Sequence, residues 1–168
     1  MNEADLIPEH DTDAFVSAMR QVASTVNIIT TKVPDCQGFR GLTATAFCSV
    51  TAAPPTVLVC VNKSSGTHDT ILQSKIFCVN VLSTDQMDIA LLFSRPASPQ
   101  ERFGKGRWLQ LASGAPVLEG CLANIDCTLV ESINASTHTI FIGRALAITE
   151  NPALSPLIYS NREFSSLS

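Results

Sequence analysis

A row of hydroxyl side chains in residues 41–51 (GLTATAFCSVT) is the part of this sequence best suited to holding a polar ligand. If the segment forms one strand, alternation places Thr43, Thr45 and Ser49 on the same face. Side chains two positions apart on a strand are separated by roughly 6.6 Å. The alanines between them keep bulk away from the backbone, so that a flat ring could approach main-chain N–H groups. The residues alone leave two interpretations open: a ligand site of this kind, or a solvent-facing strand in which threonine is simply common.

Motifs for other chemistries are absent or weak. The sequence contains no GxGxxG, GxxxxGK[ST] or GxSxG pattern, which argues against a Rossmann or P-loop nucleotide site and against a serine hydrolase. The three histidines, His10, His68 and His138, are far apart in the sequence, and no HExxH spacing exists. On residue pattern alone, His138 is typical of a capping or solvated residue at the start of a strand. The segment 63–67 (KSSGT) is loosely suited to a phosphate group.

Cysteine usage favours packing over chemistry. Six cysteines stand at positions 36, 48, 60, 78, 121 and 127, with no CxxC spacing, and most lie inside apolar runs. In a reducing compartment such residues are small core side chains. Cys36, in a polar segment, is the exception, and we predict no metal site.

Composition restricts the possible partners. The 168 residues carry a net charge of -4, are 45% hydrophobic and only 15% charged, and show no basic stripe, so we expect no nucleic-acid partner. No apolar run approaches the roughly 18 residues that a membrane helix needs. The acidic start MNEADLIPEHDTD does not resemble a signal peptide, and we expect a cytoplasmic protein. The positive mean hydropathy indicates apolar surface that an oligomer or a ligand covers.

Hydrophobic periodicity predicts a mainly antiparallel β-barrel with a few helical inserts. The expected strands are 26–31, 41–51, 56–62, 75–83, 121–131 and 139–149, and the segment 157–164 closes the chain. An amphipathic helix over 13–25 would be capped by Asp11 or Thr12. Thr67 and Thr84 would cap two further helices, the second with Met87, Ala90 and Leu91 on its inner face. Residues 95–108 are polar and rich in turn residues, which predicts a functional or mobile loop. We expect a loose tail over 1–12 and one domain over 13–168.

The run GLTATAFCSVTAAPPTVLVCVN (41–62) closely resembles the short-chain flavin reductases, the reductase components of two-component flavin-dependent monooxygenases. Supporting blocks follow in the same order as in that family: AFVSAMRQVASTVNIITT before this run, then FCVNVLSTDQ, ERF, STHTIFIGRALAI and PLIYSNREF. The likeness covers roughly residues 13–165. Within the family it is nearest to reductases that serve 4-hydroxyphenylacetate hydroxylases and similar enzymes.

The resemblance implies a homodimer of FMN-binding split barrels. It implies reduction of FMN or FAD by NADH, or by NADPH, with the reduced flavin leaving for a separate oxygenase. The family's flavin contacts correspond to Thr43, Ala44, Thr45, Ala46, Ser49, Cys60, Val61, Asn62, Lys63, Ser64, Tyr159 and Arg162. The family's histidine near flavin and nicotinamide corresponds to His138, the expected catalytic residue.

One departure from the family pattern concerns that histidine. Many relatives have Gly-Asp-His before the last long strand, whereas this chain has Ser136-Thr137-His138. The lost carboxylate leaves His138 without an evident hydrogen-bond partner. Two alternatives to a shuttling reductase therefore stay open: a flavoprotein that holds FMN tightly, and a flavin-binding split barrel without reductase activity.

Overall fold

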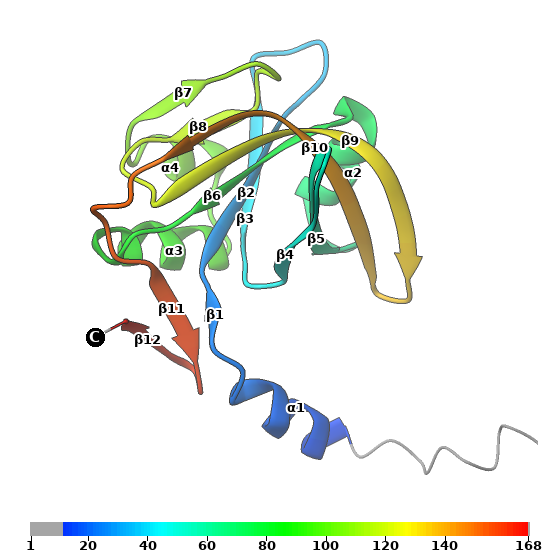
Figure 1. The fold of residues 1–168 in the computed structure, drawn as a ribbon. Coiled ribbons are helices and arrows are strands. Elements are labelled where there is room, and N and C mark those ends of the chain that lie inside the picture. Colours follow the sequence, from blue (N-terminus) through cyan, green and yellow to red (C-terminus); the bar gives the residue numbers. More distant parts are fainter. Residues whose placement is uncertain (1–11, 168) are drawn as a thin grey trace, which may run out of the picture.

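The computed structural model describes residues 12–167 and is built around a curved seven-stranded sheet of order β3–β2–β6–β9–β10–β5–β4 (Figure 1). Every neighbouring pair in this sheet is antiparallel. Its strands are β2 (Asn27–Lys32), β3 (Phe39–Ala44), β4 (Phe47–Ala52), β5 (Pro55–Asn62), β6 (Ile76–Val81), β9 (Ala123–Ala135) and β10 (His138–Glu150). The mainly antiparallel fold that periodicity predicted is confirmed.

The sheet closes into a barrel at the junction of β3 and β4. These strands form opposite edges of the sheet, yet only Thr45 and Ala46 separate them in the chain. Ala44 and Phe47 are three residues apart and so can lie no more than about 11 Å from each other, which means that the two edges come close there. The backbone N–H of Cys60 on β5 donates to the carbonyl of Ala46 over 3.0 Å and fixes this corner.

Smaller elements surround the barrel. A three-stranded sheet contains β1 (Ser24–Thr25), β11 (Leu157–Ser160) and β12 (Glu163–Ser166), and a ribbon contains β7 (Trp108–Gln110) and β8 (Pro116–Leu118). The helices are α1 (Thr12–Arg20), α2 (Gly66–Ser74), α3 (Met87–Ser94) and α4 (Pro99–Phe103), and a 3₁₀ turn, η2 (Thr84–Gln86), precedes α3. In Figure 1, α1 projects below β1 and the β11–β12 hairpin.

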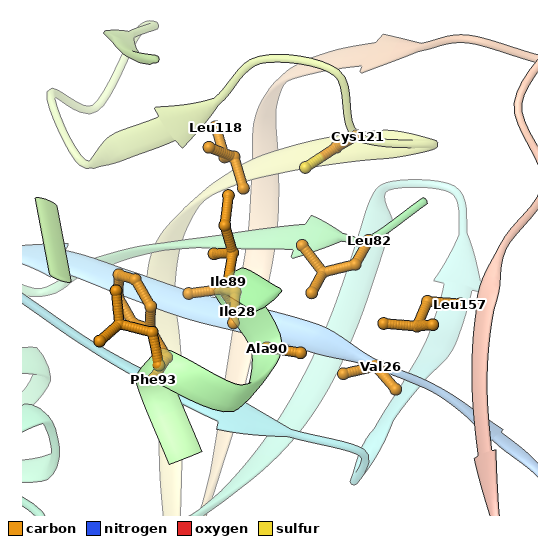
Figure 2. Close-up of a cluster of buried hydrophobic side chains, with 10 residues drawn as sticks. Val26, Ile28, Leu82, Ile89, Ala90, Phe93, Leu118, Cys121 and Leu157 are labelled. Carbon is orange, nitrogen blue, oxygen red and sulfur yellow. The ribbon is translucent and has the colours of Figure 1, made fainter. Parts of the chain in front are cut away.

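Two clusters of buried side chains hold these layers together. The barrel interior is filled by β-branched and aromatic residues, among them Phe77 and Phe141, and Ile71 of α2 joins them at one end. Gly143 allows this packing, because a Cβ there would lie 2.3 Å from Cζ of Phe77. Figure 2 shows the second cluster, in which Ile89 and Phe93 of α3 pack with Ile28 of β2.

The predicted strand 41–51 is two strands. Alternation was expected to continue through Thr45 and Ala46, but both residues lie in the corner between β3 and β4. A corner made of small residues leaves the period-two pattern intact in the sequence while the chain turns. Thr43 and Ser49 therefore belong to opposite edges of the sheet rather than to one face of a single strand.

The two predicted helix caps were wrong by one or two positions. Ser65, not Thr67, caps α2, since its hydroxyl accepts from the N–H of Thr67 over 3.2 Å. Ser83, not Thr84, is the N-cap of η2, and its backbone N–H donates to Oε1 of Gln86 over 3.1 Å. The α-helix then begins at Met87 rather than at Thr84.

The inner face of α3 also differs from the prediction. Met87 and Leu91 are 45% and 49% exposed, whereas the buried side chains are Ile89, Ala90, Leu92 and Phe93. The preceding 3₁₀ turn has three residues per turn, and this shifts the phase that a helix counted from Thr84 would have. Of the expected inner face, only Ala90 is buried.

Residues 95–108, predicted to be a functional or mobile loop, contain a short helix. They contain α4, whose N-cap Ser98 forms a capping box with Glu101. Phe103 packs at 5.4 Å from the ring of Phe93 and at 4.9 Å from Trp108. The segment is thereby fixed against α3, in a position that matters for the cleft described below.

Other expectations had mixed outcomes. The strand over 26–31 is β2, the strand over 56–62 is β5, and 75–83 and 139–149 contain β6 and β10. The amphipathic helix is shorter than 13–25 and ends at Arg20. Cys78, Cys121 and Cys127 are buried as predicted and Cys36 is exposed, but Cys48 is exposed as well. The expected tail over 1–12 and the candidate cap Asp11 lie outside the described residues, except for Thr12, which begins α1.

Candidate functional site

A cleft of about 870 Å³ opens where the barrel corner meets the surrounding elements. Its walls come from the end of β3, the loop and first turn of α2, the end of α3, α4, and the β11–β12 hairpin. Volumes of roughly 300–1,000 Å³ are typical of cofactor and ligand sites. Six of the thirteen residues assigned by resemblance line this cleft: Thr43, Ala44, Thr45, Ser64, Tyr159 and Arg162.

The two threonines of the corner have different environments. The Thr43 hydroxyl donates to the carbonyl of Ala90 over 2.7 Å and ties β3 to α3. Thr45 is exposed to the cleft, and among residues 12–167 its hydroxyl has no hydrogen-bond partner. Thr45 is therefore the hydroxyl available to a ligand, while Thr43 also has a structural role.

The first turn of α2 forms a second wall, over residues 64–67. Asn62 Oδ1 accepts from both the N–H and the hydroxyl of Ser64 over 2.9 Å, which fixes the loop before the helix. Within residues 64–68, the N–H groups of Ser64, Ser65, Thr67 and His68 are already bonded to Asn62 or Ser65, so the N–H of Gly66 and the partial positive charge of the helix end remain to favour an anion. The composition of 63–67 had suggested a phosphate, and the helix start gives that suggestion a structural basis.

Arginines give the cleft a positive charge: Arg40, Arg95, Arg102 and Arg162 all line it. Arg102 is the most constrained. Its Nη1 donates to the carbonyl of Gly41 over 2.8 Å and its Nη2 to that of Arg95 over 2.7 Å, and its guanidinium lies 5.6 Å from the ring centre of Phe93. Its Nε is buried and has no hydrogen-bond partner within residues 12–167. Burial lowers the pKa of Arg102, and the charge of Arg95 lowers it further.

Sequence reasoning did not assign Arg102 a role. The triplet ERF that contains it supported the resemblance, but the surrounding segment was interpreted as a loop. The signal that could have found it is the capping pattern Ser98-Pro-Gln-Glu101, which predicts a short helix that contains Arg102.

The opposite wall carries two aromatic rings. Tyr159 on β11 and Phe164 on β12 are half-buried, with ring centres 5.2 Å apart, and both line the cleft. Arg162 sits between them in the hairpin turn. The two rings are tilted by 57° to each other, and they give the cleft aromatic surface in addition to the small residues of the corner.

Seven of the assigned residues do not line the cleft. Val61 is fully buried in the barrel, and Ser49 and Ala46 are exposed. Cys60 is half-buried on β5, where burial and then the neighbouring Cys48 raise its thiol pKa. Asn62 accepts hydrogen bonds from Ser64 in the loop before α2. The remaining two are Lys63 and His138, and the roles assigned to all seven stay predictions.

Lys63 and His138 lie at the turn that joins β9 to β10. Lys63 Nζ donates to Asn134 Oδ1 and to the carbonyl of Ser136. His138 is half-buried, and on β10 it stands opposite Asn62, the last residue of the neighbouring strand β5. Its Nδ1 lies 2.9 Å from the hydroxyl of Thr137, so the histidine has a hydrogen-bond partner that the sequence had not suggested.

Residues 12–167 contain no cluster of histidine, cysteine, aspartate or glutamate that could hold a metal ion. Within the same range, none of the helices has the length and apolar character needed to cross a bilayer.

A flavin mononucleotide fits the residues of the cleft. The corner at 44–46 presents small side chains, the first turn of α2 and the arginines suit a phosphate, and the Tyr159–Phe164 wall suits a ring system. The buried Nε of Arg102 is a donor without a partner in the described protein, as expected beside an anion site.

The architecture defines the class of protein, because it is that of the flavin reductase split barrels. The Streptomyces globisporus C-1027 NADH:FAD oxidoreductase SgcE6 matches with a TM-score of 0.87 and 27% identity, over 99% of this chain and 99% of that chain. BorF, the flavin reductase component of a bacterial two-component tryptophan halogenase, matches with a TM-score of 0.83 and 32% identity, over 94% of this chain and 98% of that chain.

The sequence gives the family. The profile of the Flavin reductase like domain matches residues 19–168. The FMN reductase (NADH) RutF of Serratia proteamaculans (strain 568) is 40% identical over 153 residues, which are 91% of this chain and 86% of that protein. The chain belongs to the flavin reductase like domain family.

Proposed function

We propose that this protein is an NADH-dependent FMN reductase whose reduced flavin serves a separate oxygenase. Its class, an NAD(P)H:flavin oxidoreductase, follows from family membership. The curated relatives are named for FMN and NADH, which favours this pair over FAD and NADPH. The observation that carries the proposal is that one cleft is lined by the small residues of the barrel corner, the N-terminus of α2 and four arginines.

Each wall of the cleft has a distinct task in this proposal. The N–H of Gly66 at the start of α2, together with the positive charge of Arg102, would hold the phosphate. The Thr45 hydroxyl would bind the ribityl chain, and the backbone at 44–46 would hydrogen-bond the ring edge. When bound, the flavin supplies the acceptor for a hydride from nicotinamide. The protein's contribution is to position the two rings and to exclude water, and no general base is needed.

His138 keeps its proposed place near the nicotinamide, on the resemblance alone. It lies outside the lining of the cleft, and Thr137 is its partner. We expect His138→Ala to lower NADH turnover while FMN affinity stays nearly intact. Steady-state kinetics and an FMN titration measure the two effects, and unchanged turnover would remove His138 from the site.

A separate oxygenase is proposed because two structural neighbours are named as component B of nitrilotriacetate monooxygenase and as the flavin reductase of styrene monooxygenase. Such a shuttle must release its product, and weak flavin binding is then expected. We propose a cytoplasmic location as well, since all six thiols are free, which suits a reducing compartment. The 4-hydroxyphenylacetate assignment stays a prediction.

A homodimer is proposed from the outer surface of the barrel. Apolar side chains that point outward from β4, β9 and β10 are 42–56% exposed: Val50, Val130, Ile133, Leu146 and Ile148. Exposed apolar patches of this kind mark interfaces, and extended sheet faces suit a two-fold contact with a second copy. Light scattering should give twice the mass of one chain for the native protein and a smaller mass for Leu146→Asp.

The decisive experiment follows NADH consumption at the nicotinamide absorbance band, with FMN, FAD and riboflavin supplied in turn, and repeats each series with NADPH. We expect the highest kcat/KM with NADH and FMN. A protein that purifies yellow and keeps stoichiometric flavin through dialysis would instead be a tight flavoprotein. No NADH oxidation with any flavin would contradict reductase activity itself.

A further inference from the structure

Asn27, the first residue of β2, is a fully buried polar side chain that uses only its donor group. Its Nδ2 donates to the carbonyl of Thr25 over 3.0 Å and to that of Ala44 over 3.2 Å. Its Oδ1 is buried as well and has no hydrogen-bond partner within residues 12–167. The two carbonyls fix the orientation of the amide, because turning it over would set its oxygen against both of them.

The side chain of Asn27 costs the folded state stability. A buried acceptor without a partner has lost its hydrogen bonds to water and gained none in return. A leucine of similar size would avoid that cost on β2, a strand that lies between β3 and β6. A half-satisfied polar residue at such a place is expected where function rather than packing decides the residue type.

The carbonyl of Ala44 that Asn27 holds belongs to the barrel corner. The next carbonyl, of Thr45, accepts from the N–H of Phe47 over 2.9 Å, and that of Ala46 accepts from β5 as described above. In the part of the chain that the structure describes, the N–H groups of Thr45 and Ala46 have no hydrogen-bond partner. The corner therefore has its carbonyls bonded inside the protein and two donors unpaired.

Asn27 determines the direction of one of these donors. The carbonyl of Ala44 and the N–H of Thr45 belong to one planar peptide unit, and in a trans unit they point in opposite directions. Because Asn27 holds the carbonyl from the buried side, the N–H of Thr45 points away from Asn27, on a residue that lines the cleft. The N–H of Ala46 belongs to the following peptide unit, which Phe47 fixes instead.

The start of β2 is a rigid support for this contact. Val26 donates its N–H to the carbonyl of Leu157 over 2.9 Å, and its own carbonyl accepts from the N–H of Leu82 over 2.9 Å. Figure 2 shows the side chains of these three residues in the second buried cluster. Asn27 thus links the corner to the core, which is how a binding group is held in a fixed direction.

We propose that Asn27 is a positioning residue for flavin reduction: it holds the peptide between Ala44 and Thr45 so that the Thr45 N–H donates to the edge of the flavin ring. The proposal rests on the proposed function. A donor at this edge favours the reduced ring, which carries more negative charge than the oxidised ring. Asn27 does not line the cleft, so it acts through the corner and not by contact with the ligand.

Asn27→Leu is the informative variant, because leucine fills the same space and cannot hold the Ala44 carbonyl. We expect the Kd for FMN reduced under anaerobic conditions to rise about tenfold, as for the loss of one hydrogen bond to a charged group. The Kd for oxidised FMN should rise no more than about twofold. Thr30→Val is the matched control, since Thr30 is also fully buried on β2, but its hydroxyl donates to the carbonyl of Pro116 on the β7–β8 ribbon.

A second variant and a measurement on the native protein make the test independent of how well leucine is accommodated. Asn27→Thr suits a strand, and its hydroxyl is one bond shorter than the amide, so it should reproduce the change in the ratio of the two Kd values. In the native protein, hydrogen exchange of the Thr45 amide should slow when FMN binds, and slow further with reduced FMN.

Three results would overturn the proposal. Equal losses of affinity for oxidised and reduced FMN would mean that Asn27 only supports the fold. Native values of both Kd in Asn27→Leu would mean that the corner keeps its geometry without the amide. Unchanged exchange of the Thr45 amide on binding of either form would mean that this N–H does not meet the flavin.

The two proposals fail separately. If the native protein oxidises no NADH with any flavin, the proposed function is wrong, whatever Asn27 holds in place. If the native protein is active and Asn27→Leu shows the same ratio of Kd values as Thr30→Val, the role of Asn27 alone is wrong.

Discussion

Thr43 near the end of β3 and Thr45 in the barrel corner are two residues apart, and the structure predicts opposite consequences for the same substitution. Valine replaces a hydroxyl by a methyl group at nearly constant volume and keeps β-branching. Thr43→Val removes the 2.7 Å hydrogen bond to the carbonyl of Ala90, which joins β3 to α3. Thr45→Val removes a hydroxyl that has no partner among residues 12–167 and faces the cleft.

The magnitudes follow from these environments. A typical intramolecular hydrogen bond contributes about 1 kcal/mol, so Thr43→Val should lower the free energy of unfolding by about that amount. For a chain of this size, that corresponds to a fall in Tm of about 2–4 °C. Thr45→Val should change the unfolding free energy by no more than about 0.5 kcal/mol. If FMN uses that hydroxyl, its Kd should rise by roughly fivefold.

Thermal unfolding and a fluorescence titration with FMN measure the two effects on the same preparations. The two variants serve as each other's controls, since both lose one hydroxyl from the corner. An FMN Kd for Thr45→Val within about twofold of the native value would mean that no ligand uses the corner hydroxyl. An unchanged Tm for Thr43→Val would mean that its hydrogen bond is replaced by water at no cost, and the assignment of a structural role would fail.

Three further predictions concern the framework of the site. Gly143→Ala should lower the free energy of unfolding by about 2 kcal/mol in urea unfolding, because the added Cβ would lie 2.3 Å from a ring atom of Phe77. Gly66→Ala is the control, since a Cβ at that position would have no neighbouring atom within 4 Å. Arg102→Met should weaken binding of FMN far more than that of riboflavin in parallel titrations, and a lysine at that position should restore little, because only the guanidinium fork reaches both carbonyls. Burial raises the pKa of Cys121 and Cys127 from 9.0 to about 12, so the unfolded chain ionises first. Their stabilising contribution is complete below the unfolded pKa and is lost above it, by about 1.4 kcal/mol per pH unit for each thiol. The free energy of unfolding should therefore fall less steeply with pH across that range in Cys127→Ala than in the native protein, as measured by urea unfolding at several pH values.

The strands were predictable because their signal is local. The runs 26–31 and 56–62 are rich in β-branched residues, and turn residues bound them, so that side-chain stiffness and burial favour the same conformation. The antiparallel class followed from the lack of regular helices between strands. The order of the strands in the sheet depends on pairings distant in the sequence, which period and composition do not encode.

The corner was missed because its residues satisfy two patterns at once. Ala44, Thr45 and Ala46 are small enough to continue an alternating strand, and small enough to allow a sharp change of direction. What decides between them is the hydrogen bond from Cys60 N–H to Ala46, an interaction between residues 14 positions apart. The predicted single face of hydroxyls thus became one structural hydroxyl and one available hydroxyl.

The position of Arg102 in the cleft could not be predicted from the sequence. Its position depends on α4, a helix of five residues that is too short to be stable alone. The rings of Phe93, Phe103 and Trp108 hold α4 in place, and they come from three different elements. Lys63, the first residue of the KSSGT segment, was the expected phosphate ligand. Its ammonium group instead donates to Asn134 Oδ1 and to the carbonyl of Ser136.

The way Arg102 is held also bears on how tightly a flavin would bind. Both of its Nη groups are committed to backbone carbonyls, so little of the fork is free for a bidentate phosphate contact. A phosphate in the cleft would then meet Arg102 as a fixed positive charge without a bidentate contact, and beside it the N–H of Gly66, and such contacts are modest in strength when water competes for them. An anion site built this way favours exchange over retention, and exchange is what a reductase needs if its product leaves for another enzyme.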